Sequence, residues 1–295
     1  MSIHQSRVGY LGPKEATFGY TAARKLFDRP EIVDGFGPFE FEPFVSQPEI
    51  PSILARKDID FGVVAYENAL DGAVNDTINR VVAEHKRSGI TILAEVQVPI
   101  IMCAMRKPGF DGKPIAKVFS HEVALRQCNE YVSKLEKLGA CRESCPSTGK
   151  AAEIAASDGS VVALATDGAA KKFGLVLIES GSVADYKKNT TNFWVLSFHP
   201  ALPSKEKTCV LINLVRDKPG GLYRSLGAFA NRGLNLATMN KVPIPETIPR
   251  EYDFLFEVET SLDNHALVDA LNELRFNGHC IWETPKVLGS YPVIK

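Results

Sequence analysis

The stretch Asn189-Thr190-Thr191-Asn192-Phe193-Trp194-Val195-Leu196 passes from small polar side chains to aromatic and β-branched ones. Residues of the second kind favour β-structure, so the pattern predicts a buried strand with polar groups at its mouth. Hydroxyls and amides at such an edge are well placed to line a cleft, because the strand holds the backbone in place. A surface turn leading into a core strand has the same pattern, and the octapeptide alone favours that plainer interpretation.

The composition is that of an ordinary soluble globular protein. The chain has 295 residues, 45% hydrophobic and 23% charged, and this length predicts about two domains. The formal net charge of −1 provides no electrostatic basis for binding nucleic acid or an anionic membrane. Apolar runs such as 98–104 are far shorter than the roughly 20 residues that span a bilayer. We therefore expect neither nucleic acid nor a membrane as a partner.

Neither the N-terminus nor the cysteines indicate export or a metal site. Residues 1–7 lack the apolar core of a signal peptide, which predicts a cytoplasmic protein. The six cysteines form no CxxC pair, and no histidine lies near Cys141 and Cys145, the two closest in sequence. We expect free thiols in a reducing compartment and no metal.

The segment before residue 189 alternates between predicted strands and predicted helices. Such alternation favours an α/β fold with parallel sheets. The proline-rich segment 36–51 is predicted as a loop, with a short strand at 41–45 as the alternative. The predicted strands are 8–11, 59–65, two within 90–104, 117–119 and 161–165. The predicted helices have inward-facing residues at Tyr20, Ala23, Leu26 and Phe27; at Val74, Ile78, Val81 and Val82; at Leu125, Cys128, Val132 and Leu135; and over 151–156 and 168–173.

Polar residues stand where these helices begin, near residues 16, 68, 120 and 147. The hydroxyl of Ser147, for example, occupies the position of a helix N-cap. In open α/β sheets, ligands bind outside the carboxyl ends of the strands. We therefore expect these helix starts to converge on a cleft.

The composition changes at 200–207, and the rest of the chain is predicted to form a self-contained unit. Strands are predicted at 209–215, 236–241 and 252–259, and the last strand is predicted to begin at Cys280. A helix follows the turn at 217–221, and another contains inward-facing Leu267 and Leu274. The resulting order βαββαβ is the ferredoxin-like arrangement. It contains no catalytic constellation, so we expect a role in regulation or assembly.

Several stretches together resemble prephenate dehydratases that carry a C-terminal ACT domain, and they follow the family order over nearly the whole chain. The matching stretches are Gly12-Pro13 with Thr17-Phe18, Val63-Val64-Ala65-Tyr66-Glu67-Asn68, Ser120-His121 with Gln127-Cys128, Ser147-Thr148, Asn189-Thr190-Thr191-Asn192-Phe193, and Asp217-Lys218-Pro219-Gly220-Gly221-Leu222.

The resemblance implies an α/β fold with a two-lobed catalytic domain, like periplasmic binding proteins, over 6–199. A ferredoxin-like ACT domain with an amino-acid effector is implied over 207–292, and so is a homodimer or homotetramer. Family members convert prephenate to phenylpyruvate with loss of carbon dioxide and water, and they use no metal or organic cofactor. The expected partner is a small molecule, either prephenate or a related cyclohexadienyl acid.

By resemblance, Thr191 is the hydroxyl that assists departure of the substrate hydroxyl. Because threonine is a poor acid, we expect it to act as a positioned donor. Glu67, Asn68 and Gln127 complete the residues assigned to catalysis. The residues assigned to substrate binding are Thr17, Ser120, His121, Ser147, Thr148, Asn192, Phe193 and Lys14, and those assigned to effector binding are Gly220, Gly221, Leu222, Asn240 and Lys241.

Several of these residues also have a purely structural interpretation. Asn68, Ser120 and Ser147 stand near predicted helix starts, where each would serve as an N-cap. Glu67 would pair with a neighbouring Lys or Arg, and Gln127 would face solvent on the outer side of its helix.

The sequence departs from the family pattern at ligand-facing positions. Asn192 replaces the arginine of Thr-Arg-Phe, and asparagine cannot make the charged, bidentate contact with a carboxylate. Ala69 replaces a serine, and the first glycine loop is one residue longer through Lys14-Glu15. In the ACT unit, Asn240-Lys241-Val242-Pro243 replaces Glu-Ser-Arg-Pro, the phenylalanine-binding stretch. We expect another cation to answer the substrate carboxylate, and the candidates are Lys14 first, then Lys150 and Lys187.

Three functions are consistent with this pattern. The first is a prephenate dehydratase, favoured because Thr191, Glu67 and Asn68 persist. The second is a non-aromatising prephenate decarboxylase of specialised metabolism, which removes carbon dioxide but keeps the hydroxyl. The third is a non-catalytic sensor of a small ligand, since two-lobed clefts and ACT domains both bind ligands without chemistry.

Overall fold

The structure of the chain, a computed structural model, describes residues 5–110, 112–215, 219–244, 252–276, 280 and 284–295. The chain divides into two compact units. The first contains Met1–Ile50, Val63–Gly72 and Gln97–Phe193, and the second contains Pro51–Gly62, Ala73–Val96 and Trp194–Lys295. In the described part of the chain, no helix combines the length and apolar composition needed to cross a membrane.

The first unit opens with a parallel pair of strands covered by a helix. β1 (Ser6–Leu11) pairs in parallel with β2 (Phe39–Phe44), and α1 (Phe18–Phe27) lies between them in sequence. The prediction of a loop over 36–51 is therefore wrong, and the alternative strand is close to correct. Phe39 lies 4.7 Å from Phe27 of α1 between ring centroids, so aromatic packing stabilises β2. The strand tolerates Pro43 because β2 lies at the edge of its sheet.

The predicted strand at 189–196 lies inside a seven-stranded sheet with the order β16-β5-β11-β3-β1-β2. It forms β11 (Thr190–Ser197), in which the side chains from Phe193 to Leu196 are buried. The sheet also contains β3 (Phe61–Asn68), β4 (Gly72–Ala73), which pairs with β3, β5 (Thr91–Pro99) and β16 (Val293–Ile294). The remaining helical segments of this region are α2 (Pro30–Phe36), a 3-10 turn at Gln47–Glu49, α3 (Ile50–Ala55) and α4 (Asn75–Ser88).

A second sheet within the first unit has five strands in the order β10-β6-β9-β7-β8. β7 (Lys117–Ser120) runs parallel to β8 (Cys141–Ser144) and β9 (Val161–Ala165), as predicted. β6 (Cys103–Arg106) is antiparallel to β9, and β10 (Val176–Leu177) is antiparallel to β6. The prediction of parallel sheets therefore holds for β8, β7 and β9, but not for the pairs β9–β6 and β6–β10, which are antiparallel.

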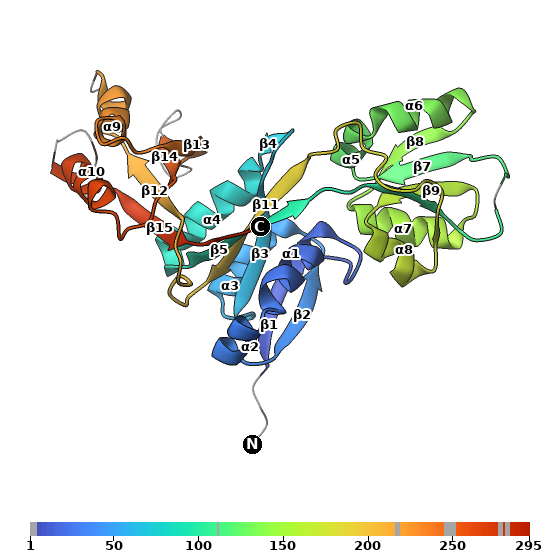
Figure 1. Cartoon of the computed structure of the whole chain (residues 1–295), viewed down its shortest axis with the longest axis horizontal. Coiled ribbons are helices and arrows are strands. Elements are labelled where there is room, and N and C mark those ends of the chain that lie inside the picture. The colour runs from blue at the N-terminus through green and yellow to red at the C-terminus, as the bar shows by residue number, and fades with distance from the viewer. Residues whose placement is uncertain (1–4, 111, 216–218, 245–251, 277–279, 281–283) are drawn as a thin grey trace. The chain divides into compact units, whose positions relative to one another are not determined.

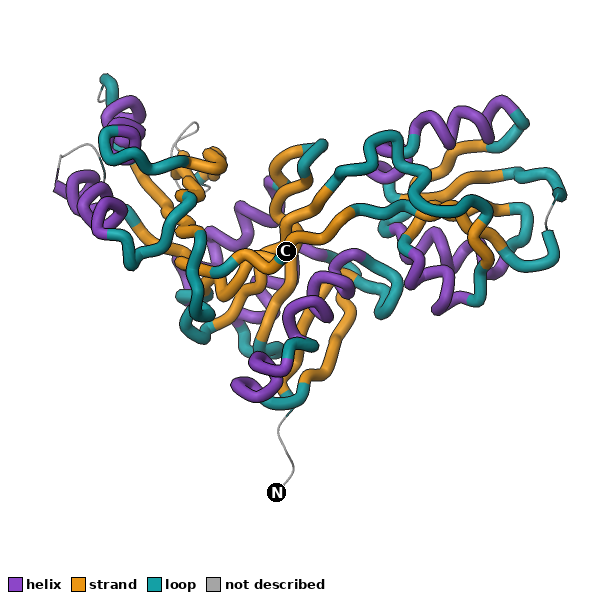
Figure 2. Tube along the Cα trace, viewed as in Figure 1, coloured by secondary structure: helices purple, strands orange, loops and turns teal. Residues whose placement is uncertain are grey.

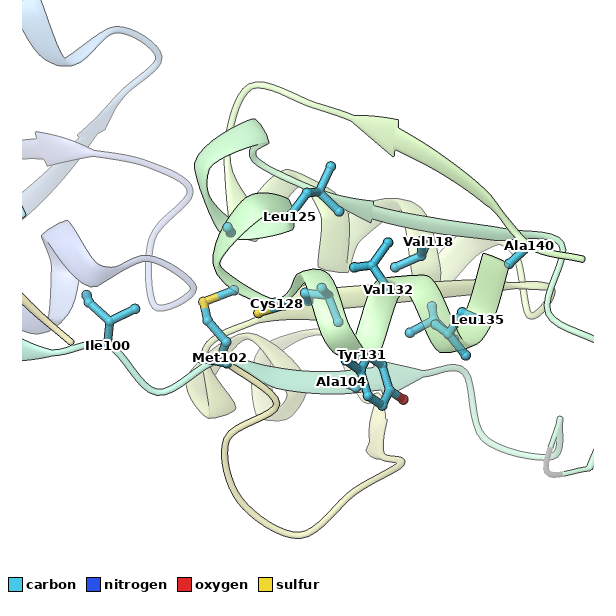
Figure 3. Close-up of a cluster of buried hydrophobic side chains, with 14 residues drawn as sticks. Ile100, Met102, Ala104, Val118, Leu125, Cys128, Tyr131, Val132, Leu135 and Ala140 are labelled. Atoms are coloured by element: carbon cyan, nitrogen blue, oxygen red, sulfur yellow. The ribbon is translucent and has the colours of Figure 1, made fainter. Parts of the chain in front are cut away.

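Helices cover both faces of this five-stranded sheet (Figure 1). Successive strand residues point to opposite faces, and the two hydrophobic clusters divide accordingly. Val162 and Leu164 pack with α5 (Glu122–Gln127) and α6 (Asn129–Lys137), in the cluster that Figure 3 draws. Val161, Ala163 and Ala165 pack with α7 (Thr148–Ser157) and α8 (Asp167–Phe173).

The helix predicted around Leu125, Cys128, Val132 and Leu135 is two helices, α5 and α6. The break falls at Cys128, whose φ of −117° and ψ of 32° are not helical. The carboxylate of Asp185 accepts hydrogen bonds from the backbone amides of Asn129 (2.9 Å) and Glu130 (3.1 Å). These amides would be unpaired at a new helix N-terminus, so Asp185 stabilises the separate start of α6.

The C-terminal segment has the predicted order βαββαβ, formed by β12 (Lys207–Asn213), α9 (Gly221–Ala230), β13 (Leu236–Pro243), β14 (Tyr252–Val258), α10 (His265–Phe276) and β15 (Lys286–Tyr291). Its four strands are antiparallel in the order β13-β14-β12-β15. α9 and α10 lie beside these strands (Figure 2) and share one hydrophobic cluster with them. β15 begins at Lys286, and Cys280 forms an isolated bridge with Leu214. Ile281 and Trp282 of the predicted strand start lie outside the described residues.

Candidate functional site

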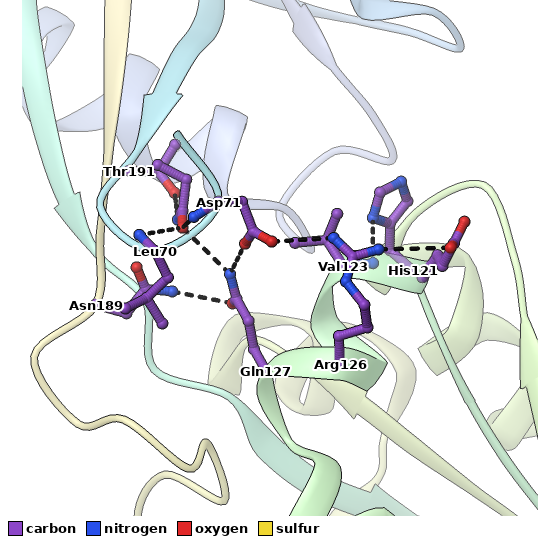
Figure 4. Close-up of polar contacts among 10 residues, drawn as sticks. Leu70, Asp71, His121, Val123, Arg126, Gln127, Asn189 and Thr191 are labelled. Atoms are coloured by element: carbon purple, nitrogen blue, oxygen red, sulfur yellow. Dashed lines mark hydrogen bonds and ion pairs between the residues drawn. The ribbon is translucent and has the colours of Figure 1, made fainter. Parts of the chain in front are cut away.

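Asn68, the last residue of β3, holds the hydroxyl of Thr191 in a defined way (Figure 4). Its Oδ1 accepts hydrogen bonds from the backbone amides of Leu70 (3.0 Å) and Asp71 (3.2 Å). Backbone amides only donate, so this atom must be the oxygen, and Nδ2 must face Thr191. Nδ2 donates to Thr191 Oγ1 at 2.8 Å. The threonine oxygen therefore accepts from Asn68, and its own proton is directed elsewhere.

Gln127, at the end of α5, joins Asn68 to two further polar residues. Its Nε2 donates to Asn68 Oδ1 at 3.2 Å and also to the carboxylate of Asp71. Its Oε1 accepts from Asn189 Nδ2 at 2.9 Å. Asn189 is 1% exposed, and its Oδ1 is buried without a hydrogen-bond partner in the described structure. We call Asn68, Asp71, Gln127, Asn189 and Thr191 the amide network. It unites segments that are far apart in sequence.

Glu67 and Asn192 form a separate pair beside this network. Asn192 Nδ2 donates to Glu67 Oε2 at 3.0 Å. The position of the family's arginine is thus occupied by a neutral donor that contacts a carboxylate of the chain itself. The next residue, Phe193, is 3% exposed and belongs to the core of the strand, so the structure gives it a packing role.

The hydroxyls and imidazole assigned to substrate binding cap helices or bond to the backbone. Thr17 Oγ1 accepts from Tyr20 N and donates to Leu11 O, and Ser147 Oγ accepts from Lys150 N at 3.1 Å. Ser147 is therefore the N-cap of α7, and Thr148 is the first residue of that helix. Ser120 does not cap a helix: it is fully buried, and its hydroxyl donates to Leu164 O at 2.6 Å.

His121 is the N-cap of α5, the position that the sequence suggested for Ser120. Its Nδ1 accepts from Val123 N at 3.4 Å, which requires an unprotonated nitrogen. The residue as a whole is exposed, but partial burial of the ring lowers the pKa of His121; the charge of Glu122 opposes this shift, and that of Arg126 adds to it. The imidazole is thus set to accept a hydrogen bond and not to act as an acid at neutral pH.

The lengthened loop after β1 packs closely against two helix starts of the first unit. A Cβ at Gly149 of α7 would lie 2.7 Å from Pro13 Cδ, and one at Gly168 of α8 would lie 2.9 Å from Glu15 O. Lys172 Nζ donates to Lys14 O. Glycine at positions 149 and 168 therefore allows this approach.

The structure does not bring the three candidate cations to the amide network. The exposed Lys14 lines a separate hollow of about 430 Å³ together with Arg24 and Glu40. Lys150 forms an ion pair with Glu153 at 2.9 Å, and Lys187 donates to Ser182 O. Arg126 does contact the network, through Asp71 Oδ1 at 3.0 Å.

Sequence reasoning missed Asp71, Arg126 and Asn189 as members of this site. Asp71 is a turn residue directly before a glycine, and Arg126 is an exposed residue of a helix, so each has an ordinary local interpretation. Asn189 opens the polar stretch that flanks Thr191, and its polarity next to a buried strand was a usable signal.

The residues assigned to effector binding lie around α9 and β13. Gly220, with a φ of 77°, is the N-cap of α9, Gly221 is its first residue, and Leu222 packs against the hydrophobic cluster. Asn240 and Lys241 lie on β13, and Lys241 Nζ lies 4.0 Å from the ring centroid of Tyr252. Asp217 and Lys218 of the predicted motif lie outside the described residues.

Cysteines and potential metal ligands are dispersed. All six cysteines are free, and only Cys141 is exposed. Burial, the largest cause, raises the pKa of Cys128 to about 12, so that thiol stays protonated. The described residues contain no cluster of three or more His, Cys, Asp or Glu side chains that would hold a metal ion.

Comparisons with known proteins agree with this geometry. The sequence profile of the prephenate dehydratase family matches residues 8–201. A bifunctional chorismate mutase/prephenate dehydratase of Aquifex aeolicus is 31% identical over 97% of this chain and 73% of its own length. An arogenate dehydratase/prephenate dehydratase of Arabidopsis thaliana is 29% identical over the same shares. The structure of a prephenate dehydratase from Arthrobacter aurescens in complex with L-Phe has a TM-score of 0.80 and 25% identity, covering 97% of this chain and 90% of that one. The chain belongs to the prephenate dehydratase family.

Proposed function

We propose that this chain converts prephenate to phenylpyruvate, carbon dioxide and water. The ring carboxylate leaves as carbon dioxide, and its bonding electrons enter the ring. The opposite C–O bond breaks as the hydroxyl takes up a proton and departs as water. The ring becomes aromatic, which drives the reaction. The protein must hold the carboxylates, donate a hydrogen bond to the departing hydroxyl and exclude water.

The observation that carries this proposal is the fixed orientation of the Asn68 amide. Because Nδ2 of Asn68 donates to Thr191 Oγ1, the hydroxyl of Thr191 remains available as a donor. Thr191 is 9% exposed, so a hydrogen bond that it donates acts in a partly desolvated environment. We assign Thr191 as the hydrogen-bond donor to the departing hydroxyl. Asn68 and Gln127 position Thr191, and Glu67 lies beside them.

The two carboxylates of prephenate need positive partners, and the pair of Glu67 and Asn192 provides none. This pair favours a second candidate substrate, arogenate, in which an amino group replaces the keto oxygen of the prephenate side chain. That side chain is zwitterionic and requires less positive charge. The Arabidopsis relative is named for both substrates.

Comparing the two substrates with purified enzyme tests both candidates. We expect phenylpyruvate from prephenate, or phenylalanine from arogenate, and kcat/KM for each identifies the better substrate. A decarboxylated product that keeps its hydroxyl would establish the non-aromatising decarboxylase instead. Binding of both acids without turnover would establish a sensor.

We further propose that residues 6–199 form the two-lobed catalytic domain and residues 207–292 an ACT domain. The βαββαβ order and antiparallel sheet of the second segment support this assignment. A homodimer or homotetramer remains the expected assembly. Thr17, His121, Ser147, Thr148 and Asn192 remain proposed substrate contacts, while Lys14, which lines a separate hollow, does not. Ser120 and Phe193 are proposed to act through the strands that they join or pack.

Phenylalanine is expected to bind this ACT domain weakly or not at all. Lys241 contacts the ring of Tyr252 where the family has a polar, arginine-bearing stretch, so both charge and shape differ. Isothermal titration of the full-length protein with phenylalanine should show no saturable binding in the micromolar range. Micromolar binding accompanied by loss of activity would contradict this expectation and would assign recognition to the loop before α9.

A further inference from the structure

Asp71 has two different hydrogen-bond donors on its two carboxylate oxygens. Arg126 donates to Oδ1 at 3.0 Å, and Gln127 Nε2 donates to Oδ2. The Asp71 side chain is 29% exposed and that of Arg126 is 52% exposed, so water reaches both partners in part. Each oxygen of Asp71 accepts from a different side chain, so the carboxylate holds Arg126 and Gln127 at the same time (Figure 4).

Gln127 depends on this carboxylate for its own orientation. Its Nε2 has two protons, which go to Asn68 Oδ1 and Asp71 Oδ2. If the amide of Gln127 were reversed, its oxygen would face two acceptors. The carboxylate of Asp71 thus makes the reversed state unfavourable, and it also sets Oε1 toward Asn189.

We propose that Asp71 is a positioning residue for the reaction: held by Arg126, it fixes the amide of Gln127, which adds a third hydrogen bond to Oδ1 of Asn68 and so helps to keep Nδ2 of Asn68 on Thr191. Through the same amide it directs Nδ2 of Asn189 toward Gln127, which leaves Asn189 Oδ1 as a buried acceptor. This inference rests on the proposed function only for its kinetic consequences. The geometry itself is independent of the substrate.

Asp71→Asn is the informative substitution. An asparagine has one acceptor oxygen, so either Arg126 or Gln127 loses its acceptor whichever way the amide turns. We expect kcat to fall about tenfold while KM changes less than about threefold, because misplaced catalytic groups affect turnover more than binding. Asp71→Glu keeps both oxygens and should recover most of the activity.

Glu122→Gln is the matched control. Glu122 is the other carboxylate that contacts Arg126, at 3.4 Å, but it does not touch Gln127, and its side chain is 76% exposed. Its removal should leave kcat unchanged within about twofold. A loss as large as that of Asp71→Asn would overturn the proposal, because neutralising either partner of Arg126 would then suffice.

The double variant Asp71→Asn/Gln127→Ala separates positioning from a general effect of charge. If Asp71 acts through Gln127, its substitution should cost nothing further in the Gln127→Ala background. If kcat of the double variant falls by the product of the two single-variant factors, the proposal is overturned. Should the wild type turn over neither prephenate nor arogenate, the same cycle is read from thermal unfolding. A double variant that loses less Tm than the two single variants together supports the coupling. A loss equal to their sum refutes it, whatever the substrate.

Discussion

At the scale of single residues, the site depends on which atoms donate and which accept. Two backbone amides fix the side chain of Asn68, and Asn68 in turn fixes Thr191 as a donor. A threonine hydroxyl is too weak an acid to serve as a proton reservoir. Its value lies in a hydrogen bond that strengthens as negative charge develops on the departing oxygen.

Thr191→Ala should therefore lower kcat by about two orders of magnitude with little change in KM. A donor aimed at developing charge contributes roughly 2–4 kcal/mol to a partly closed site. Thr191→Ser, which keeps the hydroxyl, should retain most of the activity, and Thr190→Ala provides a neighbouring control. Steady-state kinetics on folded variants check this, and near-normal turnover of Thr191→Ala would remove the hydroxyl from the mechanism.

Asn192→Arg tests the missing motif arginine. A guanidinium at this position would lie beside Glu67 and add one positive charge to the site. We expect the ratio of kcat/KM for prephenate to that for arogenate to rise about tenfold, since prephenate has the greater need for positive charge. Asn192→Gln is the neutral control. An unchanged ratio would mean that carboxylate recognition takes place elsewhere in the site.

At the scale of elements, the loop after β1 and the start of α7 fit together without space for a side chain. Gly149→Ala would place a methyl group 2.7 Å from Pro13 Cδ and 3.0 Å from Ala16 O. We expect a loss of about 1–3 kcal/mol in the free energy of unfolding. Gly35→Ala is the control, because an added Cβ there meets nothing within 4 Å. Urea unfolding of both variants tests the contact, and equal stabilities would show that the loop adapts.

His85 of α4 makes stability depend on pH. Burial, the largest cause, lowers the pKa of His85, the charges of Lys286 and Lys86 add to this, and a hydrogen bond with Ile90 O opposes it. The unfolded chain then binds a proton near the ordinary value of about 6.5 while the folded chain does not. The free energy of unfolding should therefore fall as the pH drops through that value. Urea unfolding at pH 7.5 and 5.5 should show that the free energy of unfolding changes less with pH in His85→Gln than in the wild type. An equal change in both proteins would contradict this.

Local patterns predicted most elements but missed those that tertiary contacts create. The apolar period of α1 and α4 and the β-branched runs of β3 and β9 are visible in the sequence alone. β2 depends on aromatic packing against α1, and the division between α5 and α6 depends on Asp185, which lies 56 positions from Asn129. Contacts at such a distance have no local signature.

At the scale of the whole molecule, the ordered family motifs predicted Thr191, Asn68, Glu67 and Gln127 as neighbours of the site. The structure unites three of these residues in one hydrogen-bonded network and sets Glu67 beside it with Asn192. The remaining network members, Asp71 and Asn189, have ordinary local surroundings. They belong to the network because both form hydrogen bonds with the side-chain amide of Gln127.

The most direct test of the account is the product formed from prephenate by the purified wild type and by Thr191→Ala. The account predicts that the wild type releases phenylpyruvate and carbon dioxide in equal amounts, measured by the ultraviolet absorbance of phenylpyruvate in base and by trapped carbon dioxide. It also predicts that Thr191→Ala does so about a hundredfold more slowly. Carbon dioxide release without an aromatic product, or equal rates for the two proteins, would contradict it.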